Sequence, residues 1–470
     1  MGKSKELAKN TVIIAFGKIC TQMISFFLLP VYTALLSTHD YGIVDLLNTY
    51  IMLIIPIVSV QIDQGIFRFM ITSSDKKSRK QNVMSGLVFS SVISILYSIF
   101  FVCIQFFWKS PYKWFLLTNV IASIFSNILL QVSRGLKDNI TYAIASTIVG
   151  VSTVICNVIF IVFLHMGALG MFMAGLVGNC FCIIFLIVRK RLWEYVDIHA
   201  FSLSHTIEII RYTAPLVPSS LSWWAIDASD RSIVSIFLGL SANGILSIAH
   251  KIPSVLTQVF NIFNIAWVEF VITHFNDEER DSLFTETINM VFSLFSSLCL
   301  CVIAFIPFVF TIIINKKFDK AYNQIPLLII AVIFTMITNL YTSFYISQKQ
   351  SKKIGSTAVL SAIIDIVIHC TLISFIGLYA ATISSAFAYG VMMIIRYRDC
   401  TSIVEAKLKK KNVLITIVVT LVVVFIYYLE NIYLKMMALI LVIIYSIYIN
   451  SNFLKIVWTS IIRKNRGRKL

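Results

Sequence analysis

Long apolar runs, separated by short polar stretches, occupy most of the chain from Thr11 nearly to the C-terminus. Each run is about 20 residues long, which lets one helix cross a hydrocarbon core of roughly 30 Å. No polar gap approaches the roughly 50 residues that a soluble domain needs. The pattern therefore predicts an all-α integral membrane protein.

The runs predict about fourteen transmembrane helices joined by short connections. We expect them near residues 11–36, 41–67, 83–107, 114–134, 140–164, 168–188, 207–238, 242–271, 283–314, 324–347, 354–376, 378–396, 412–429 and 434–461. We group them as an N-terminal lobe over 1–200 (helices 1–6), a C-terminal lobe over 201–397 (helices 7–12), and a segment 398–470 with helices 13 and 14 and a basic tail.

Composition agrees with this pattern. Hydrophobic residues make up 58% of the 470 residues and charged residues only 13%, where soluble domains carry roughly a quarter. Mean hydropathy is +0.88. The nine cysteines lie mostly inside apolar runs, and their spacing fits neither a disulfide framework nor a metal site. We therefore expect no metal and no cofactor.

Basic residues are concentrated on one side of the predicted topology. They fill the N-terminal segment, residues 73–80, 189–191, 348–353 and 396–411, and the C-terminal tail. Two loops do not follow this bias. The loop 315–320 is basic but lies on the side that is otherwise poor in charge, and the loop 276–281 is acidic but lies on the basic side. The overall bias predicts cytoplasmic termini. The net charge of +17 is spread over short juxtamembrane stretches, so it does not indicate nucleic-acid binding.

The two predicted lobes share a weak internal repeat. Residues 33–46 align without gaps on residues 235–248, which pairs Gly42 with Gly244. Residues 166–178 align on 378–390 in the same order. Helices 1–6 and 7–12 are therefore expected to be two copies of one unit, related by a pseudo-two-fold axis along the membrane normal. In transporters built from repeats, the substrate lies between the halves.

Two segments carry a family resemblance: GKICTQMISFFLLPVYTALLS followed by THDYG, and LGLSANGILSIAHKI in the second half. With the fourteen-helix plan, they resemble the polysaccharide flippases of the multidrug/oligosaccharidyl-lipid/polysaccharide exporter superfamily. The resemblance covers the first twelve helices. It implies movement of undecaprenyl-diphosphate-linked oligosaccharide repeat units across the bacterial inner (cell) membrane, for O-antigen (lipopolysaccharide), capsule or exopolysaccharide synthesis. A polysaccharide polymerase and a chain-length regulator are then expected partners.

Cations inside predicted helices are candidate substrate ligands, because a charge in the bilayer is costly. Lys18, Arg68, Arg231 and Lys251 are the four candidates. A diphosphate needs dispersed positive charge and hydrogen-bond donors, which Arg231 and Lys251 on neighbouring helices would supply. The alternative for Lys18 and Arg68 is snorkelling to the interface. For Arg231 it is a structural ion pair with Asp227, four residues earlier.

Other ionisable groups are candidates for coupling or for lining the cavity. Asp365 and His369 lie four residues apart and could relay a proton or satisfy each other. Asp227 and His250 are further polar candidates. Pro215 and Pro218 predict a bend in helix 7.

Motifs for catalysis are missing from the sequence. It holds no phosphate-binding loop, no H-E-x-x-H and no nucleophile elbow, and the outside loops are short. We therefore expect a transporter and not an enzyme. Two alternatives stay open: a cation-coupled drug or metabolite antiporter of the same superfamily, using Asp63 or Asp365, and a membrane polysaccharide polymerase.

Overall fold

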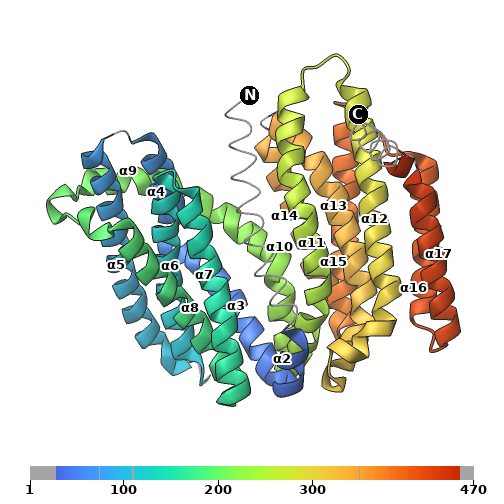
Figure 1. Cartoon of the computed structure of the whole chain (residues 1–470), viewed down its shortest axis with the longest axis horizontal. Helices are drawn as coiled ribbons and strands as arrows, with labels where there is room; N and C mark the ends of the chain where they lie inside the picture. Colours follow the sequence, from blue (N-terminus) through green and yellow to red (C-terminus); the bar gives the residue numbers. More distant parts are fainter. Residues whose placement is uncertain (1–27, 74, 108–110, 349, 452, 456–470) are drawn as a thin grey trace, which may run out of the picture. The chain divides into compact units, whose positions relative to one another are not determined.

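The structure is a computed structural model, described here for residues 28–73, 75–107, 111–348, 350–451 and 453–455. Side chains at 107, 219, 222, 223 and 225–228 are not described. The chain divides into two compact units, residues 1–247 and 248–470. Within the described residues every regular element is helical (Figure 1). The predicted boundaries of lobes at residues 200 and 397 stay a prediction.

Unit 1 contains the helices up to α10 and the start of α11. Its elements are α2 (Leu29–Leu35), α3 (Thr38–Ser59), α4 (Ile62–Thr72), α5 (Lys76–Ile104), η1 (Gln105–Phe107), α6 (Lys113–Gly135), α7 (Asn139–Asn157), η2 (Val158–Phe163), α8 (Gly167–Lys190), η3 (Leu192–Glu194), η4 (Ile198–Ala200), α9 (Leu203–Thr213) and α10 (Leu216–Phe237). A segment of π-helix, η2, extends α7 without a break.

Unit 2 contains most of α11 and all that follows. Its elements are α11 (Leu240–His274), α12 (Arg280–Ile313), η5 (Lys316–Gln324), α13 (Ile325–Ser347), α14 (Ser351–Ile376), α15 (Tyr379–Thr401), α16 (Lys410–Tyr427) and α17 (Ile432–Ile449).

Twelve helices in the described part of the chain are long and apolar enough to span a membrane. They correspond in order to the predicted helices, except the first and the seventh. The first lies mostly outside the described residues, and the seventh is divided into α9 and α10. The protein is thus a multi-pass, all-helical membrane protein, while the count of fourteen stays a prediction.

Two predicted helices are broken in unit 1. The second breaks between α3 and α4, where Val60 and Gln61 both take the left-handed conformation (φ 48° and 51°). The seventh breaks at Ala214 and Pro215, between α9 and α10. Left-handed geometry is unusual for a β-branched residue such as Val60. The bend predicted from Pro215 is confirmed. The break at Val60 was not predicted, because neither Val60 nor Gln61 is a glycine or a proline.

The core of unit 1 surrounds α4. Ile62 and Ile66 of α4 pack with Ile128 of α6 and Ile209 of α9, and all four are fully buried. A Cβ on Gly65 would lie 2.5 Å from the Ile209 side chain, so α4 and α9 are in close contact. Packing thereby holds both broken helices side by side.

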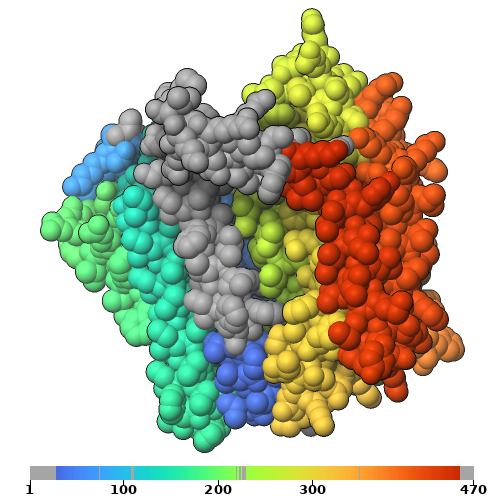
Figure 2. All heavy atoms as spheres, turned by 45° about the vertical axis from the view of Figure 1, so that its right-hand side comes forward, coloured from blue at the N-terminus to red at the C-terminus, as the bar shows by residue number. Residues whose placement is uncertain are grey.

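Unit 2 is built around α13, whose aromatic side chains Tyr341, Phe344 and Tyr345 are buried. Trp267 of α11 packs edge-on against Phe284 of α12 and Phe344 of α13, and its indole nitrogen donates to the Leu340 carbonyl at 3.0 Å. The last helix, α17 (red), lies beside α12 (yellow) in the space-filling view (Figure 2). Asn450 fixes that contact by donating to Ser297 Oγ at 2.9 Å.

Candidate functional site

The predicted cation Arg231 forms an ion pair between two helices of unit 1. Its Nε lies 2.8 Å from Asp45 Oδ2, joining α10 to α3, and the two side chains are 22% and 16% exposed. Trp224, seven residues earlier on α10, donates its indole N–H to the Thr49 carbonyl of α3 at 2.8 Å. The guanidinium of Arg231 is therefore half-buried, and its orientation is set by the Asp45 carboxylate.

Asp45, and not Asp227, is the carboxylate that the structure pairs with Arg231. Asp45 lies inside the second predicted helix, where a charge is as costly as at Arg231, so its position in the sequence was the signal that could have identified it. The side chain of Asp227 lies outside the described side chains, so its pairing with Arg231 and its role in the cavity stay predictions.

The broken helices are joined by Gln61, at the break itself. Its amide nitrogen donates to Ser220 Oγ of α10, and to the Leu216 carbonyl at 3.3 Å. Leu216 begins α10, directly after the break at Pro215. One side chain thus connects the start of α4 to the start of α10.

Repeat-related glycines contact each other where α3 meets the first turns of α11. A Cβ on Gly42 would lie 1.8 Å from the Leu240 carbonyl oxygen, and a Cβ on Gly244 would lie 2.0 Å from the Thr38 oxygen. Because the alignment of the repeats pairs Gly42 with Gly244 and Thr38 with Leu240, the contact is reciprocal. Asn243 adds a hydrogen bond to the Gly42 carbonyl at 2.9 Å. The backbones approach too closely for any side chain.

The remaining predicted cations belong to different parts of the chain. Arg68 is exposed on α4, three residues beyond Gly65 in the core. Lys251 is half-buried on α11, in unit 2. Lys18 lies outside the described residues. A shared cavity for these cations therefore stays a prediction.

Asp365 and His369 are both deeply buried on α14, with 3% and 0% exposure. Their spacing of four residues places them on one face of the helix. His250 is half-buried on α11, next to Lys251. The burial fits either a proton relay or a packed polar pair, so the coupling role stays a prediction.

Arg396 of α15 is a buried cation that the sequence reading missed. It is 1% exposed and donates to Thr357 Oγ1 at 2.9 Å, to Thr342 Oγ1 at 2.5 Å and to the Ile354 carbonyl at 3.1 Å. Arg396 ends the twelfth predicted helix and begins the basic segment 396–411, which indicates the cytoplasmic side and not a buried charge. The sequence feature that could have indicated a buried arginine is the presence of threonines, its hydrogen-bond acceptors, on the two preceding helices.

A family model described as polysaccharide biosynthesis protein matches residues 7–268, more than half of the chain. The chain belongs to this polysaccharide biosynthesis protein family. The matched range includes the Asp45–Arg231 pair, both helix breaks and the glycine contact. None of the curated proteins matches the chain.

Solved structures share the fold of this polysaccharide biosynthesis protein at low sequence identity. An inward-facing MATE multidrug transporter of the MOP superfamily matches with TM-score 0.68 and 15% identity, over 83% of this chain and 98% of its own. The lipid II flippase MurJ, in an inward closed conformation, matches with TM-score 0.66 and 14% identity, over 95% and 99%. A MOP transporter from Pyrococcus furiosus matches with TM-score 0.57 and 14% identity, over 85% and 96%. The fold is therefore that of MOP transporters, as the resemblance implied.

Two cavities in unit 2 of this family member adjoin α16. An apolar groove of about 460 Å³ lies against α13, α15 and α16, where Lys410 is its one charged lining residue. A polar cavity of about 520 Å³ lies between α12, α16 and α17. Within the described residues, no cluster of three or more His, Cys, Asp or Glu side chains could hold a metal.

Proposed function

We propose that this protein is a flippase that moves undecaprenyl-diphosphate-linked oligosaccharide repeat units from the cytoplasmic to the outer leaflet of the bacterial cytoplasmic membrane. The units supply surface polysaccharide synthesis, and both termini lie in the cytoplasm. The halves of the molecule alternate in exposing the cargo, while the polyprenyl tail stays in lipid. No bond of the cargo is made or broken.

The family match is the observation that carries the proposal, because it connects the chain to polysaccharide synthesis. The fold supports a membrane transporter, and its length favours the flippase. The lipid II flippase aligns with 95% of this chain and the MATE transporter with 83%. The difference between these two shares of the chain has the length of about two transmembrane helices. Two is also the number of helices that we expect beyond the twelve of an antiporter.

Arg231 is the proposed ligand whose surroundings are best defined. A guanidinium matches a diphosphate in geometry and stays charged when desolvated. Asp45 Oδ2 lies 2.8 Å from the Arg231 guanidinium, and a diphosphate entering the site would compete with that carboxylate. Exchange of one anion for the other lets cargo binding loosen α3 from α10. Lys251, Lys18 and Arg68 are the further proposed cations.

The membrane potential is a sufficient energy source for outward movement of an anion. Each negative charge moved out of an inside-negative cell gains about 2.3 kcal/mol per 100 mV. A proton relay through Asp365 and His369 is the alternative source. An Asp365→Asn variant separates the two, because only the relay needs an ionisable carboxyl.

The second candidate function is a cation-coupled antiporter. It is favoured by the burial of Asp365, at 3% exposure, and by the MATE fold match. Asp63, which accepts from Gln64 at 2.8 Å in the first turn of α4, is its other proposed carboxylate. A cationic cargo would then be held by carboxylates and not by Arg231.

The test is to delete the gene and measure which leaflet contains the lipid-linked repeat units. The flippase predicts loss of surface polymer, with intact units on the cytoplasmic side. Lys251→Ala and Arg231→Ala should accumulate units in the same way, and Lys320→Ala, an exposed lysine of η5, should behave as wild type. Units that reach the outer face but stay unpolymerised would contradict flipping and favour the polymerase.

A further inference from the structure

A basic cavity lies at the end of unit 1 where α5 begins. It has a volume of about 550 Å³ and is lined by Lys76, Lys77, Lys80, Gln81, Asp197, His199, Ala200, Phe201 and Ser202. Three lysines face one carboxylate, so the lining carries excess positive charge. The lysines and Gln81 come from the first turns of α5, and the other lining residues come from the connection between α8 and α9.

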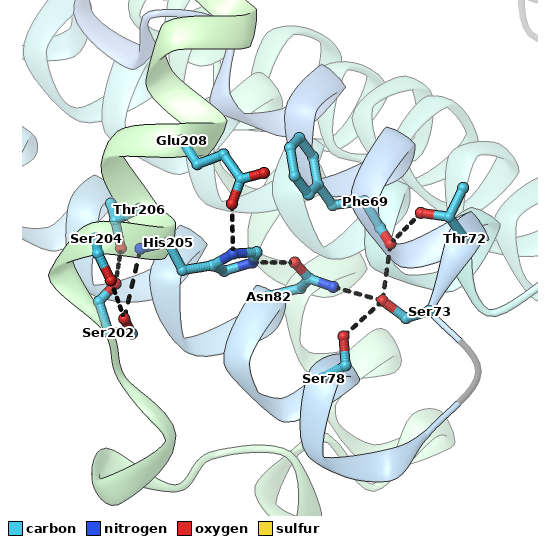
Figure 3. Close-up of polar contacts among 10 residues, drawn as sticks. All are labelled: Phe69, Thr72, Ser73, Ser78, Asn82, Ser202, Ser204, His205, Thr206 and Glu208. Carbon is cyan, nitrogen blue, oxygen red and sulfur yellow. Dashed lines mark hydrogen bonds and ion pairs between the residues drawn. The ribbon is translucent and has the colours of Figure 1, made fainter.

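Ion pairs and hydrogen bonds hold this connection on α5. Lys80 Nζ lies 3.0 Å from Asp197 Oδ2, and this hydrogen bond lowers the pKa of Asp197. Lys76 Nζ lies 3.7 Å from Glu194. At the start of α9, His205 and Asn82 hydrogen-bond at 2.7 Å between a ring nitrogen and the amide oxygen (Figure 3). These contacts hold the α8–α9 connection, which forms one wall of the cavity, against α5.

The same connection exposes large apolar side chains. Ile198 is 75% exposed and Trp193 55%, and Leu203, which begins α9, is 65% exposed, while Leu192, directly before Trp193, is buried. Apolar residues with a tryptophan, beside lysines, are typical of segments that lie in the interface of a bilayer. The start of α5 and the end of α8 fall on one side of the membrane, because four spans, α5 to α8, separate them. This placement puts the cavity at the level of the lipid headgroups.

We propose that this cavity binds the headgroup of an anionic phospholipid, with the phosphate held by Lys76, Lys77 and Lys80 and the acyl chains against Trp193, Ile198 and Leu203. The shared chemistry is a phosphodiester, which a soluble phosphate compound could also present. The exposed apolar side chains favour the lipid, since a soluble anion would leave them in water. None of the proposed cargo cations lines this cavity, so the proposal does not depend on what the protein transports.

Native mass spectrometry of the full-length protein, in nanodiscs or detergent, tests the proposal by counting bound phosphatidylglycerol. The triple variant K76Q/K77Q/K80Q should lose one tightly bound lipid, with affinity falling by about fivefold for each lysine. K316Q/K317Q/K320Q is the matched control, because those lysines have the same spacing on η5 and the same loss of charge. K76R/K77R/K80R should retain the lipid.

The single variant K77Q guards against loss of folding, because Lys77 is exposed and its removal leaves both ion pairs in place. It should weaken phosphatidylglycerol binding without changing the melting temperature. Phosphatidylcholine and inorganic phosphate are the two comparison probes. Equal lipid loss in the triple variant and the matched control would overturn the proposal. Displacement of the lipid by millimolar phosphate would also overturn it, because the site would then belong to a soluble anion.

Discussion

At the scale of single residues, a charge inside an apolar run identified Arg231 as a residue of interest but did not identify its ion-pair partner. Arg231 was selected from the sequence, and the structure shows it paired with Asp45, which comes from a helix almost 190 residues away in the chain. Sequence spacing favoured Asp227, since local pairs are the only ones that a helical period can predict. Partners from distant helices depend on packing, which the sequence pattern does not contain.

Removal of one partner should destabilise the protein more than removal of both. For Arg231→Gln or Asp45→Asn alone we expect a loss of about 2 kcal/mol, less than the roughly 3 to 5 of a fully buried pair. The double variant should regain much of that loss. Thermal unfolding in detergent measures it. If Arg231 also binds the diphosphate, the double variant will be folded and unable to flip, whereas a purely structural pair would give a folded, active double variant.

The ion pair of Asp138 and Lys190 predicts a pH effect. Burial raises the pKa of Asp138, but hydrogen bonds from Lys190 and Thr141 outweigh it and lower the pKa to about 2. A carboxyl with a lowered pKa adds stability above its usual value near 3.8, and that stability is lost as pH falls toward 2. Asp138→Asn should therefore melt below wild type at pH 6 and with wild type at pH 2. A constant difference across this range would contradict the assignment.

At the scale of elements, most helices followed directly from the apolar runs. The bend between α9 and α10 was predictable, because Pro215 cannot donate the helical hydrogen bond. The break between α3 and α4 was not, because Val60 and Gln61 are ordinary helical residues and their left-handed geometry is imposed by surrounding contacts. Gln61 itself shows one such contact, through its bond to Ser220.

The reciprocal glycine contact predicts sharp intolerance of side chains. Gly42→Ala and Gly244→Ala each place a Cβ within 2.0 Å of a backbone oxygen, so α3 and α11 must separate. We expect a lower melting temperature and lower yield for both variants. Gly355→Ala is the control, because a Cβ there meets nothing within 4 Å and alanine favours the helix. Equal effects at all three glycines would mean that the close approach is not what matters.

At the scale of the whole molecule, the sequence predicted the fold class and the family. The resemblance to polysaccharide flippases is confirmed by the family match, and the membrane fold by the MOP structures. The repeat is supported at one contact, where Gly42 and Gly244 meet in equivalent geometry. The location of the proposed cargo cavity could not be predicted from the sequence, because a cavity between helices depends on how distant helices assemble and not on any local period.

Cysteine accessibility tests the topology where the charge pattern was weakest. The basic loop at 315–320 is predicted outside and the acidic loop at 276–281 inside. In a background without the nine native cysteines, Asp319→Cys should react with a membrane-impermeant maleimide in intact cells. Asp277→Cys should react only after permeabilisation. The reverse pattern would invert the orientation and place both termini outside.

The most direct test of the central claim is flipping by the purified protein in liposomes. A fluorescent undecaprenyl-diphosphate oligosaccharide is incorporated in both leaflets, and a quencher is added outside. The flippase predicts that inner-leaflet molecules become accessible with time, faster with an imposed potential that is negative inside, and no faster than in empty liposomes for Arg231→Ala. If the oligosaccharide stays protected while the same liposomes exchange a cationic drug for protons, the flippase account is wrong and the antiporter takes its place.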